Sequence, residues 1–459
     1  MYTLTFGEIL KEGKVKLKEK ISLNRTIHGI SIDTRTLKRG DLFFALKGEQ
    51  FDGHKFLKEA EKKGAAAAVV KQRNNSLSLP QFVSSDVVFS LGNIARYIRS
   101  KWKGDVIAVC GSNGKTTTKN MLHCLLSEKF SVVSSPASYN NFCGVPLTMQ
   151  LLNNSVQLCI QEMETNQQGG IMRLCDIARP KIGIVTNIGY SHLESLKTLY
   201  GVFKEKSELI LNLPAGGTAV LNYDDNFYRR FLKKAKGIEV ISYGLGNRAD
   251  FRAKSISFGR RGISFNVKGQ SFRIPTFFMP DVYNALASLA VASGVYGISL
   301  KQCAKNLKNY KPLPLRSEVK KIKGRTFILD CFNANPSSFS ASVENLRNFS
   351  HKNKHILVGD MLELGKDSPK LHRYCGEVLA ASCVDKVFCL GSMVRWLIKG
   401  LEINKRRRDR IFYCKNRQEA VEFLRQYTRR GDLIMVKGSR SLQLEKIIQA
   451  FAKRDETSR

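Results

Sequence analysis

The feature that most constrains this chain is the short glycine-rich loop at residues 111–118, GSNGKTTT. It follows an apolar run, Asp105–Cys110, and precedes a segment with a helical pattern at residues 119–130. A strand, a loop of this kind and a helix bind the phosphates of a nucleotide, because glycines let backbone N–H groups turn inward and the helix N-terminus carries partial positive charge. Lys115 is then expected to reach the β- and γ-phosphates, and Thr116 to offer its hydroxyl to Mg²⁺.

The loop departs from the commonest phosphate loop at one position. That pattern has a further glycine five residues before Gly114, where this chain has Val109. A plain glycine-rich turn before a helix is therefore an alternative interpretation. The rest of the chain decides between the two, according to whether it fits ATP chemistry.

The charge of the chain raises a different possibility. Its 75 Lys and Arg residues outnumber 39 acidic residues, which gives a net charge of +36 and suggests an anionic partner such as nucleic acid or a membrane surface. The basic residues are spread over the whole length, however, with one tight cluster at residues 405–410, and no RNP, KH or zinc-finger pattern accompanies it. We expect no specific nucleic-acid binding.

The composition fits a soluble protein of the reducing cytosol. The first residues lack an apolar signal segment, and the longest mildly apolar run, at 285–299, is too short to span a bilayer, so we expect no membrane insertion. Eleven cysteines occur singly, without CxxC pairs or zinc spacing, which favours free thiols. With 459 residues the chain is long enough for two to four domains.

Alternating apolar runs and amphipathic stretches predict an α/β protein of three domains. We place a small N-terminal α/β domain at 1–103, with a strand at 42–46 and a helix at 54–63. A central P-loop domain with a parallel sheet follows at 104–314, with strands at 105–110, 156–163 and 182–186. A Pro-rich segment at 311–316 leads to a Rossmann-like domain at 315–459. Its expected strands are 326–330, 354–359, 386–391 and 432–437.

Polar residues follow several of these strands where they end. Glu162 and Asn187 come at the ends of two central strands, and His192 follows shortly after; Asp330 ends a strand of the third domain. Open parallel sheets bind ligands at the carboxyl ends of their strands. Since carboxylates and neutral imidazoles coordinate divalent ions, the sequence predicts a metal–nucleotide site.

Motifs along nearly the whole chain resemble those of the ATP-dependent Mur ligases. The loop is similar to their G-T/S-x-G-K-T-T/S signature, which explains the missing glycine. Residues 138–148 resemble their N-x-N-N-x-x-G-x-P-x-T loop, 282–286 match V-Y-N-A-L, and Glu162 lies in an E-x-x-x-N-x-x-G-x-I pattern. The family works with ATP and Mg²⁺, and carries a carbamylated lysine that matches Lys206.

The resemblance implies roles for individual residues. The expected magnesium ligands are Thr116, Glu162, His192 and carbamylated Lys206, and the catalytic residues Lys115, Lys206, His192 and Glu162. The expected ATP-binding residues are Gly111, Ser112, Asn113, Gly114, Lys115, Thr116, Thr117, Asn284, Arg316 and Asp330. The expected substrate-binding residues are Thr34, Arg35, Lys47, Asn140, Asn141, Asn333 and Asn335.

The third domain indicates which branch of the family is closest. Residues 330–338 resemble D-x-Y-N-A-N-P-x-S and residues 358–365 resemble V-G-D-M-x-E-L-G, both typical of the branch that adds D-alanyl-D-alanine to UDP-N-acetylmuramoyl-tripeptide. That branch forms an amide through an acyl phosphate in peptidoglycan precursor synthesis. We expect a cytoplasmic monomer; the third residue of the tripeptide, diaminopimelate or lysine, stays open.

Three positions depart from the family pattern, and three alternatives remain. Pro280 and Asp281 replace the usual His-Asn, Leu315 replaces a glycine, and Phe332 replaces a tyrosine. The alternatives are an amide ligase with another amino donor, a basic ATP-responsive nucleic-acid-binding protein, and a degenerate ligase with another role.

Overall fold

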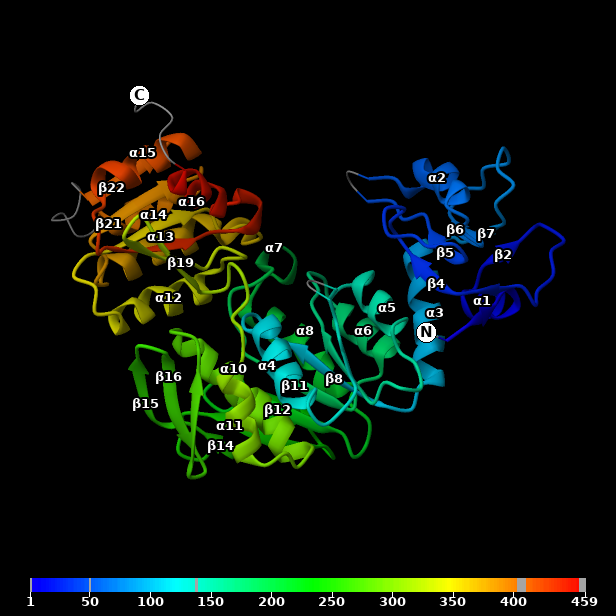
Figure 1. Ribbon diagram of the computed structural model, residues 1–459, viewed down its shortest axis with the longest axis horizontal. Coiled ribbons are helices and arrows are strands. Elements are labelled where there is room, and N and C mark those ends of the chain that lie inside the picture. Colours follow the sequence, from blue (N-terminus) through cyan, green and yellow to red (C-terminus); the bar gives the residue numbers. More distant parts are fainter. Residues whose placement is uncertain (1, 49–50, 137–138, 403–409, 454–459) are drawn as a thin grey trace.

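The chain folds into three α/β domains in sequence order (Figure 1). We describe a computed structural model, which covers residues 2–48, 51–136, 139–402 and 410–453. The N-terminal and C-terminal domains lie at opposite ends of the molecule, and the central domain joins them.

The central domain is organised by a parallel sheet of seven strands in the order β14-β13-β12-β11-β8-β10-β9. All of its neighbouring pairs are parallel. Its strands are β8 (Asp105–Cys110), β9 (Val132–Ser134), β10 (Leu158–Glu162), β11 (Ile182–Val185), β12 (Thr218–Asn222), β13 (Glu239–Gly244) and β14 (Phe251–Arg252). Strand β8 is fully flanked and mostly buried, so the loop that follows it starts from a rigid base.

Helices cover both faces of this sheet. One face packs on α4 (Lys115–Leu126), α10 (Met279–Leu289), α11 (Leu300–Lys308) and an antiparallel sheet of β15 (Lys254–Gly259), β16 (Gly262–Val267) and β17 (Gln270–Ile274). The other face packs on α5 (Gly144–Met149), α6 (Gly170–Ala178) and α8 (Leu199–Leu211). The two apolar clusters leave only the strand ends and their loops free to form a site.

The N-terminal domain has a sheet in the order β2-β7-β6-β5-β4, parallel except for β2. Its elements are β2 (Lys16–Leu17), β4 (Gly29–Ser31), β5 (Asp41–Phe44), β6 (Ala67–Val70), β7 (Gln81–Val83), α1 (Phe6–Glu12), α2 (Leu57–Lys62) and α3 (Val87–Lys101). Trp102, directly after α3, donates its indole N–H to the carbonyl of Val156 at 2.8 Å. This buried bond ties the domain to the central one.

The C-terminal domain is built on a sheet in the order β18-β19-β23-β20-β21-β22. Strand β18 is antiparallel to β19, and the remaining pairs are parallel. Its strands are β18 (Glu318–Ile322), β19 (Arg325–Leu329), β20 (Lys354–Gly359), β21 (Lys386–Leu390), β22 (Ile411–Cys414) and β23 (Leu433–Lys437). Helices α12 (Pro336–Asn345), α13 (Ser368–Ala380) and α14 (Val394–Leu401) pack on one face, and α15 (Arg417–Tyr427) and α16 (Glu445–Ala452) on the other.

The structure confirms the α/β class and corrects several element bounds. The helix expected at 119–130 is α4 and begins at Lys115, because Gly114 in a left-handed conformation turns the chain directly into it. The strand expected at 156–163 spans only Leu158–Glu162, and the helix expected at 54–63 is a short 3₁₀ turn followed by α2. The antiparallel sheet β15-β16-β17 was not predicted.

All eleven cysteines are free, as their scattered positions predicted. Most of the basic cluster, residues 405–409, lies outside the described residues. None of the described helices has the length and apolar character needed to cross a membrane.

Candidate active site

The phosphate loop leaves β8 in a conformation that requires its glycines. Gly111 and Gly114 have φ values of 141° and 82°. A Cβ on Gly111 would lie 1.9 Å from Thr186 Oγ1, and one on Gly114 would lie 2.3 Å from Asn284 Oδ1. Side chains are thus excluded at both positions by strain and by contact, and α4 begins immediately after, at Lys115.

The end of β11 fixes the shape of this loop. Ser112 N–H donates to the carbonyl of Asn187 at 2.9 Å, and Asn113 N–H donates to Asn187 Oδ1 at 3.0 Å. Thr186 Oγ1 donates to the carbonyl of Asn113 at 2.6 Å. Because β11 pairs with β8 in the sheet, the loop is anchored by a neighbouring strand rather than by its own residues alone.

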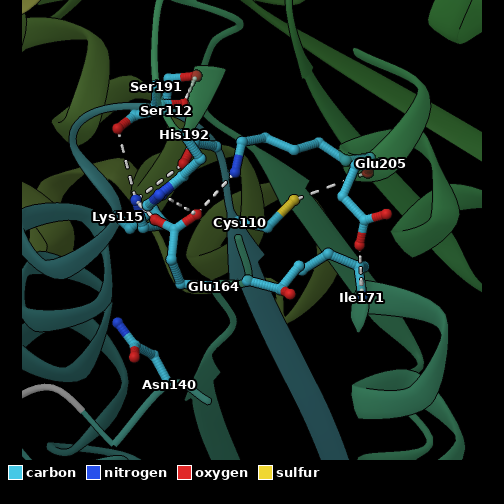
Figure 2. Close-up of polar contacts among 12 residues, drawn as sticks. Cys110, Ser112, Lys115, Asn140, Glu164, Ile171, Ser191, His192 and Glu205 are labelled. Carbon is cyan, nitrogen blue, oxygen red and sulfur yellow. Dashed lines mark hydrogen bonds and ion pairs between the residues drawn. The ribbon is translucent and has the colours of Figure 1, made fainter. Parts of the chain in front are cut away.

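Glu164, just past the end of β10, gathers three basic side chains (Figure 2). Its Oε1 lies 2.8 Å from Lys206 Nζ and 3.2 Å from His192 Nε2. Its Oε2 forms an ion pair with Lys115 Nζ. The carboxylate therefore joins the phosphate-loop lysine to two of the expected magnesium ligands.

The charges of this cluster stabilise one another. Burial raises the pKa of Glu164, but Lys115, Lys206 and His192 outweigh it and hold the pKa well below its usual range. Burial lowers the pKa of Lys206 and of His192, and in both cases Glu164 reverses the effect, so that both pKa values are raised. For His192, Glu363 of the C-terminal domain adds to the rise.

Glu162, at the end of β10, has a different environment. It is 3% exposed; Asn140 Nδ2 donates to its Oε1 at 2.9 Å, and Lys119 Nζ lies 3.7 Å from its Oε2. Within the described residues Oε2 accepts no hydrogen bond. A buried carboxylate oxygen without a hydrogen bond is costly, so this atom is a candidate ligand for a cation.

The C-terminal domain contacts the phosphate loop and its surroundings directly. Asn335 Nδ2 donates to Asn113 Oδ1 at 2.7 Å, and Tyr190 N–H donates to Ser337 Oγ at 3.2 Å. Glu363 Oε2 lies 2.7 Å from His192 Nδ1. The first of these contacts reaches the phosphate loop and the other two reach the segment after β11, so three polar contacts join the two domains here.

Two further residues of the C-terminal region are held at this junction. Asp330 Oδ2 accepts from Lys437 Nζ at 2.6 Å and from Ser342 Oγ at 2.8 Å. The Arg316 guanidinium lies 3.9 Å from the centre of the Phe332 ring, and burial lowers the pKa of this arginine. Phe332 therefore provides a flat face that positions Arg316.

These residues surround a cavity of about 1090 Å³ between the domains, which is large enough for a nucleotide and part of a second substrate. Fourteen expected site residues line it: Ser112, Asn113, Gly114, Lys115, Thr116, Thr117, Asn140, Glu162, His192, Asn284, Arg316, Asp330, Asn333 and Asn335. The glycine-rich loop, the carboxylates at the end of β10 and polar groups from a second domain thus line one cavity.

Known proteins share this architecture. A UDP-N-acetylmuramoyl-tripeptide–D-alanyl-D-alanine ligase of Bacillus subtilis is 32% identical over 429 residues, which cover 92% of this chain and 93% of the relative. The chain belongs to the Mur ligase family. Models of the Mur ligase catalytic, middle and glutamate ligase domains match residues 26–97, 109–292 and 315–440.

Other Mur ligases are also similar to this chain over most of its length. The Escherichia coli enzyme of the same name is 30% identical, covering 93% of this chain and 94% of its own length. A crystal structure of MurF from Acinetobacter baumannii has a TM-score of 0.91 at 26% identity and covers 99% of this chain and 100% of its own. MurF from Thermotoga maritima in complex with ADP has a TM-score of 0.83 at 26% identity, covering 93% and 97%.

Some expected site residues of this Mur ligase do not line the cavity. Lys206 is completely buried behind it, and Gly111 lies at the base of the loop. Asn141 Oδ1 accepts from the backbone N–H groups of Cys143 and Gly144, so this side chain shapes the loop before α5. The N-terminal set is remote: Thr34 is buried, whereas Arg35 and Lys47 are exposed.

Sequence reasoning assigned no role to Glu164 and Glu363. Glu164 follows Glu162 by two residues at the same strand end, and that position was the one available signal. Glu363 lies beyond the end of β20, again at a carboxyl strand end. The sequence did not show which basic side chains Glu164 and Glu363 contact, because Lys206 and His192 come from distant parts of the chain.

Proposed function

We propose that this Mur ligase is an ATP-dependent enzyme that joins D-alanyl-D-alanine to UDP-N-acetylmuramoyl-tripeptide and releases ADP and phosphate. The observation that carries the proposal is a single cavity between the central and C-terminal domains. Across it the phosphate loop, Glu162, Glu164 and His192 of the central domain face Asp330, Arg316 and Asn335 of the C-terminal domain. The printed names of relatives 32% and 30% identical support the substrate pair.

The reaction we propose forms an amide from a carboxylate and an amine. The terminal carboxylate of the tripeptide attacks the γ-phosphate of ATP to give an acyl phosphate and ADP. The amine of D-alanyl-D-alanine then attacks that carbonyl, and phosphate leaves. Lys115 and the N-terminus of α4 neutralise phosphate charge, while residues of the C-terminal domain position the nucleotide, so that orientation and electrostatics lower the barrier.

Magnesium fits the residues of the site. Glu162 presents a buried carboxylate oxygen without a hydrogen bond, and Thr116 lines the same cavity. In the described part of the chain no three His, Cys, Asp or Glu residues are grouped so as to hold a metal alone. This suits Mg²⁺, which takes one or two carboxylates and completes its shell with water and substrate phosphates. When bound, the ion neutralises charge on the transferring phosphate.

A carbamate on Lys206, which the resemblance implies, fits less well. Lys206 Nζ already lies 2.8 Å from a carboxylate oxygen of Glu164, and its side chain is 0% exposed. A carbamate would place a second anion against the first. Carbamylation stays a prediction, and no step of the reaction above depends on it.

The other parts of the proposal concern the whole chain. We propose domain boundaries at 103/104 and 314/315, and a UDP-sugar site in the N-terminal domain that involves Thr34, Arg35 and Lys47, with Asn140 and Asn141 nearer the reacting groups. We also propose that Asn333 and Asn335 act near the dipeptide or close over ATP. A cytoplasmic monomer fits this assignment.

Phosphate release measures the proposal directly. We expect release only when UDP-N-acetylmuramoyl-tripeptide, D-alanyl-D-alanine and Mg–ATP are all present, with either diaminopimelate or lysine in the tripeptide. Lys115→Ala should lower turnover by at least about 100-fold, since it removes the cation nearest the phosphates. Lys204→Ala, an exposed lysine of α8, is the control and should keep full turnover.

Two results would contradict the proposal. The first is phosphate release that D-alanyl-D-alanine does not stimulate while another amine does, which would indicate a ligase with a different donor. The second is unchanged turnover in Lys115→Ala.

A further inference from the structure

Glu164 contacts three basic side chains in the site, and the reaction proposed above gives it no role. Its two oxygens have different partners. Oε1 contacts Lys206 Nζ at 2.8 Å and His192 Nε2 at 3.2 Å. For Oε2, the contact among the described residues is Lys115 Nζ.

The position of Glu164 relative to the cavity separates it from Lys206. Glu164 lines the cavity beside His192 and Lys115, whereas Lys206 does not line it and is fully buried. Figure 2 shows the Glu164 carboxylate beside Lys115 and His192. A ligand that enters from the cavity therefore reaches a Glu164 oxygen before it reaches Lys206.

The contacts of Oε1 also give Glu164 a fixed orientation. A buried carboxylate needs partners that compensate for lost hydration, and Lys206 provides one from the side away from the cavity. Lys206 thus holds the carboxylate in place without occupying Oε2. Among the described residues, Oε2 meets Lys115, the lysine that is expected to reach the phosphates of ATP.

We infer that Glu164 is the anionic divalent-cation ligand beside His192, acting through Oε2 in the place that a carbamate on Lys206 would fill, with Lys206 as its counter-cation. The inference rests on the proposed function in one respect, namely that the site binds Mg–ATP. A carboxylate oxygen and an imidazole nitrogen are suitable ligands for such an ion. Once Lys115 binds phosphate, Oε2 is available to the cation.

Manganese binding tests this inference with a readout that does not depend on turnover. Mn²⁺ is titrated into the full-length enzyme with a non-hydrolysable ATP analogue and followed by electron paramagnetic resonance. We expect Glu164→Gln to weaken the binding of one Mn²⁺ by about 10- to 100-fold. Glu164→Asp, which keeps the carboxylate on a shorter side chain, should lie between Glu164→Gln and the wild type.

A matched control has the same charge change nearby. Glu194 is exposed two residues after His192, and the structure gives its side chain no contact with the described residues of the cluster. Glu194→Gln should therefore bind Mn²⁺ as the wild type does. If Glu164→Gln does not fold, the affinity of Glu164→Asp decides, because wild-type affinity in that variant would overturn the inference.

The carbamate itself can be detected independently. The ¹³C spectrum of the wild-type enzyme in ¹³C-bicarbonate should contain no carbamate resonance from Lys206. A resonance from Lys206 would be one that disappears in Lys206→Arg. Such a resonance, or equal Mn²⁺ affinity in Glu164→Gln and the wild type, overturns the inference and leaves the proposed ligase reaction intact. If the wild type binds no Mn²⁺ with the nucleotide, the magnesium-dependent function fails along with the inference.

Discussion

Asn335 makes two hydrogen bonds with different roles, and two different substitutions distinguish these roles. Its Oδ1 accepts from Ser338 N–H at 2.8 Å and caps α12, while its Nδ2 donates to Asn113 Oδ1 at 2.7 Å across the domain junction. Asn335→Ser keeps a capping oxygen but is too short to reach Asn113. Asn335→Ala loses both contacts.

The magnitudes follow from these two bonds. A neutral hydrogen bond contributes about 0.5–1.5 kcal/mol, which corresponds to a decrease of about 2- to 10-fold in kcat/KM for ATP in both variants, if the contact stabilises the closed domains in the transition state. Loss of the cap costs about 1 kcal/mol of stability. Asn335→Ala should therefore show a lower Tm than Asn335→Ser, by about 2–4 °C.

Steady-state kinetics and thermal unfolding measure both roles of Asn335. The variants compared are Asn335→Ser, Asn335→Ala, Asn113→Ala and the double variant that combines an Asn335 substitution with Asn113→Ala. In the double-mutant cycle the two substitutions should be non-additive, because they remove the same bond. Wild-type kcat/KM in Asn335→Ser would refute the role of the domain contact. A loss of stability in Asn335→Ser equal to that in Asn335→Ala would refute the role of the cap.

Two further predictions concern pH and stability. Burial raises the pKa of Glu8, but contacts with Lys101, the backbone of Thr5 and Tyr97 outweigh this effect and lower the pKa from 4.5 to about 2. The stability that Glu8 adds is therefore present above pH 4.5 and is lost as the pH falls towards 2. Urea unfolding should show Glu8→Gln about 1–2 kcal/mol less stable than the wild type at pH 7 and equal to it near pH 2, and a pH-independent difference would contradict this. Burial raises the pKa of Asp281 from 3.8 to about 6, so stability is full below pH 3.8 and falls as the pH rises through 6. Asp281→Asn should exceed the wild type by up to about 2 kcal/mol at pH 8 and match it below pH 4, and a less stable variant at pH 8 would show that the charged form is favoured.

The sequence predicted those parts of the fold that local pattern controls. The largely apolar runs at β8, β11 and β20 matched the structure within one residue, because strands buried on both faces consist mostly of apolar residues. The antiparallel sheet β15-β16-β17 was missed. Its strands alternate buried and exposed residues imperfectly, and its place is set by packing on α11 and on the central sheet.

The candidate site was predicted as a set of residues but not as a set of contacts. Glu162 and Asn187 were placed at strand ends and His192 shortly after one of them, and all three line the cavity. The partner of His192 and Lys206 is Glu164, two residues beyond the expected carboxylate. Past the end of a strand the alternation of side chains no longer applies, so only the tertiary arrangement shows which of two nearby carboxylates meets which cation.

The short helix α7 (Leu193–Leu196) has a consequence for regulation of the enzyme. Leu193 and Leu196 are buried in the same apolar cluster as Met361 and Leu364 of the C-terminal domain, although they belong to the central one. His192 directly precedes this helix, so movement of the C-terminal domain also moves this imidazole. Such coupling is reciprocal: a compound that displaces the C-terminal domain without touching the metal site proposed above would change the affinity of that site for its cation, and the cation would change affinity for the compound by the same factor.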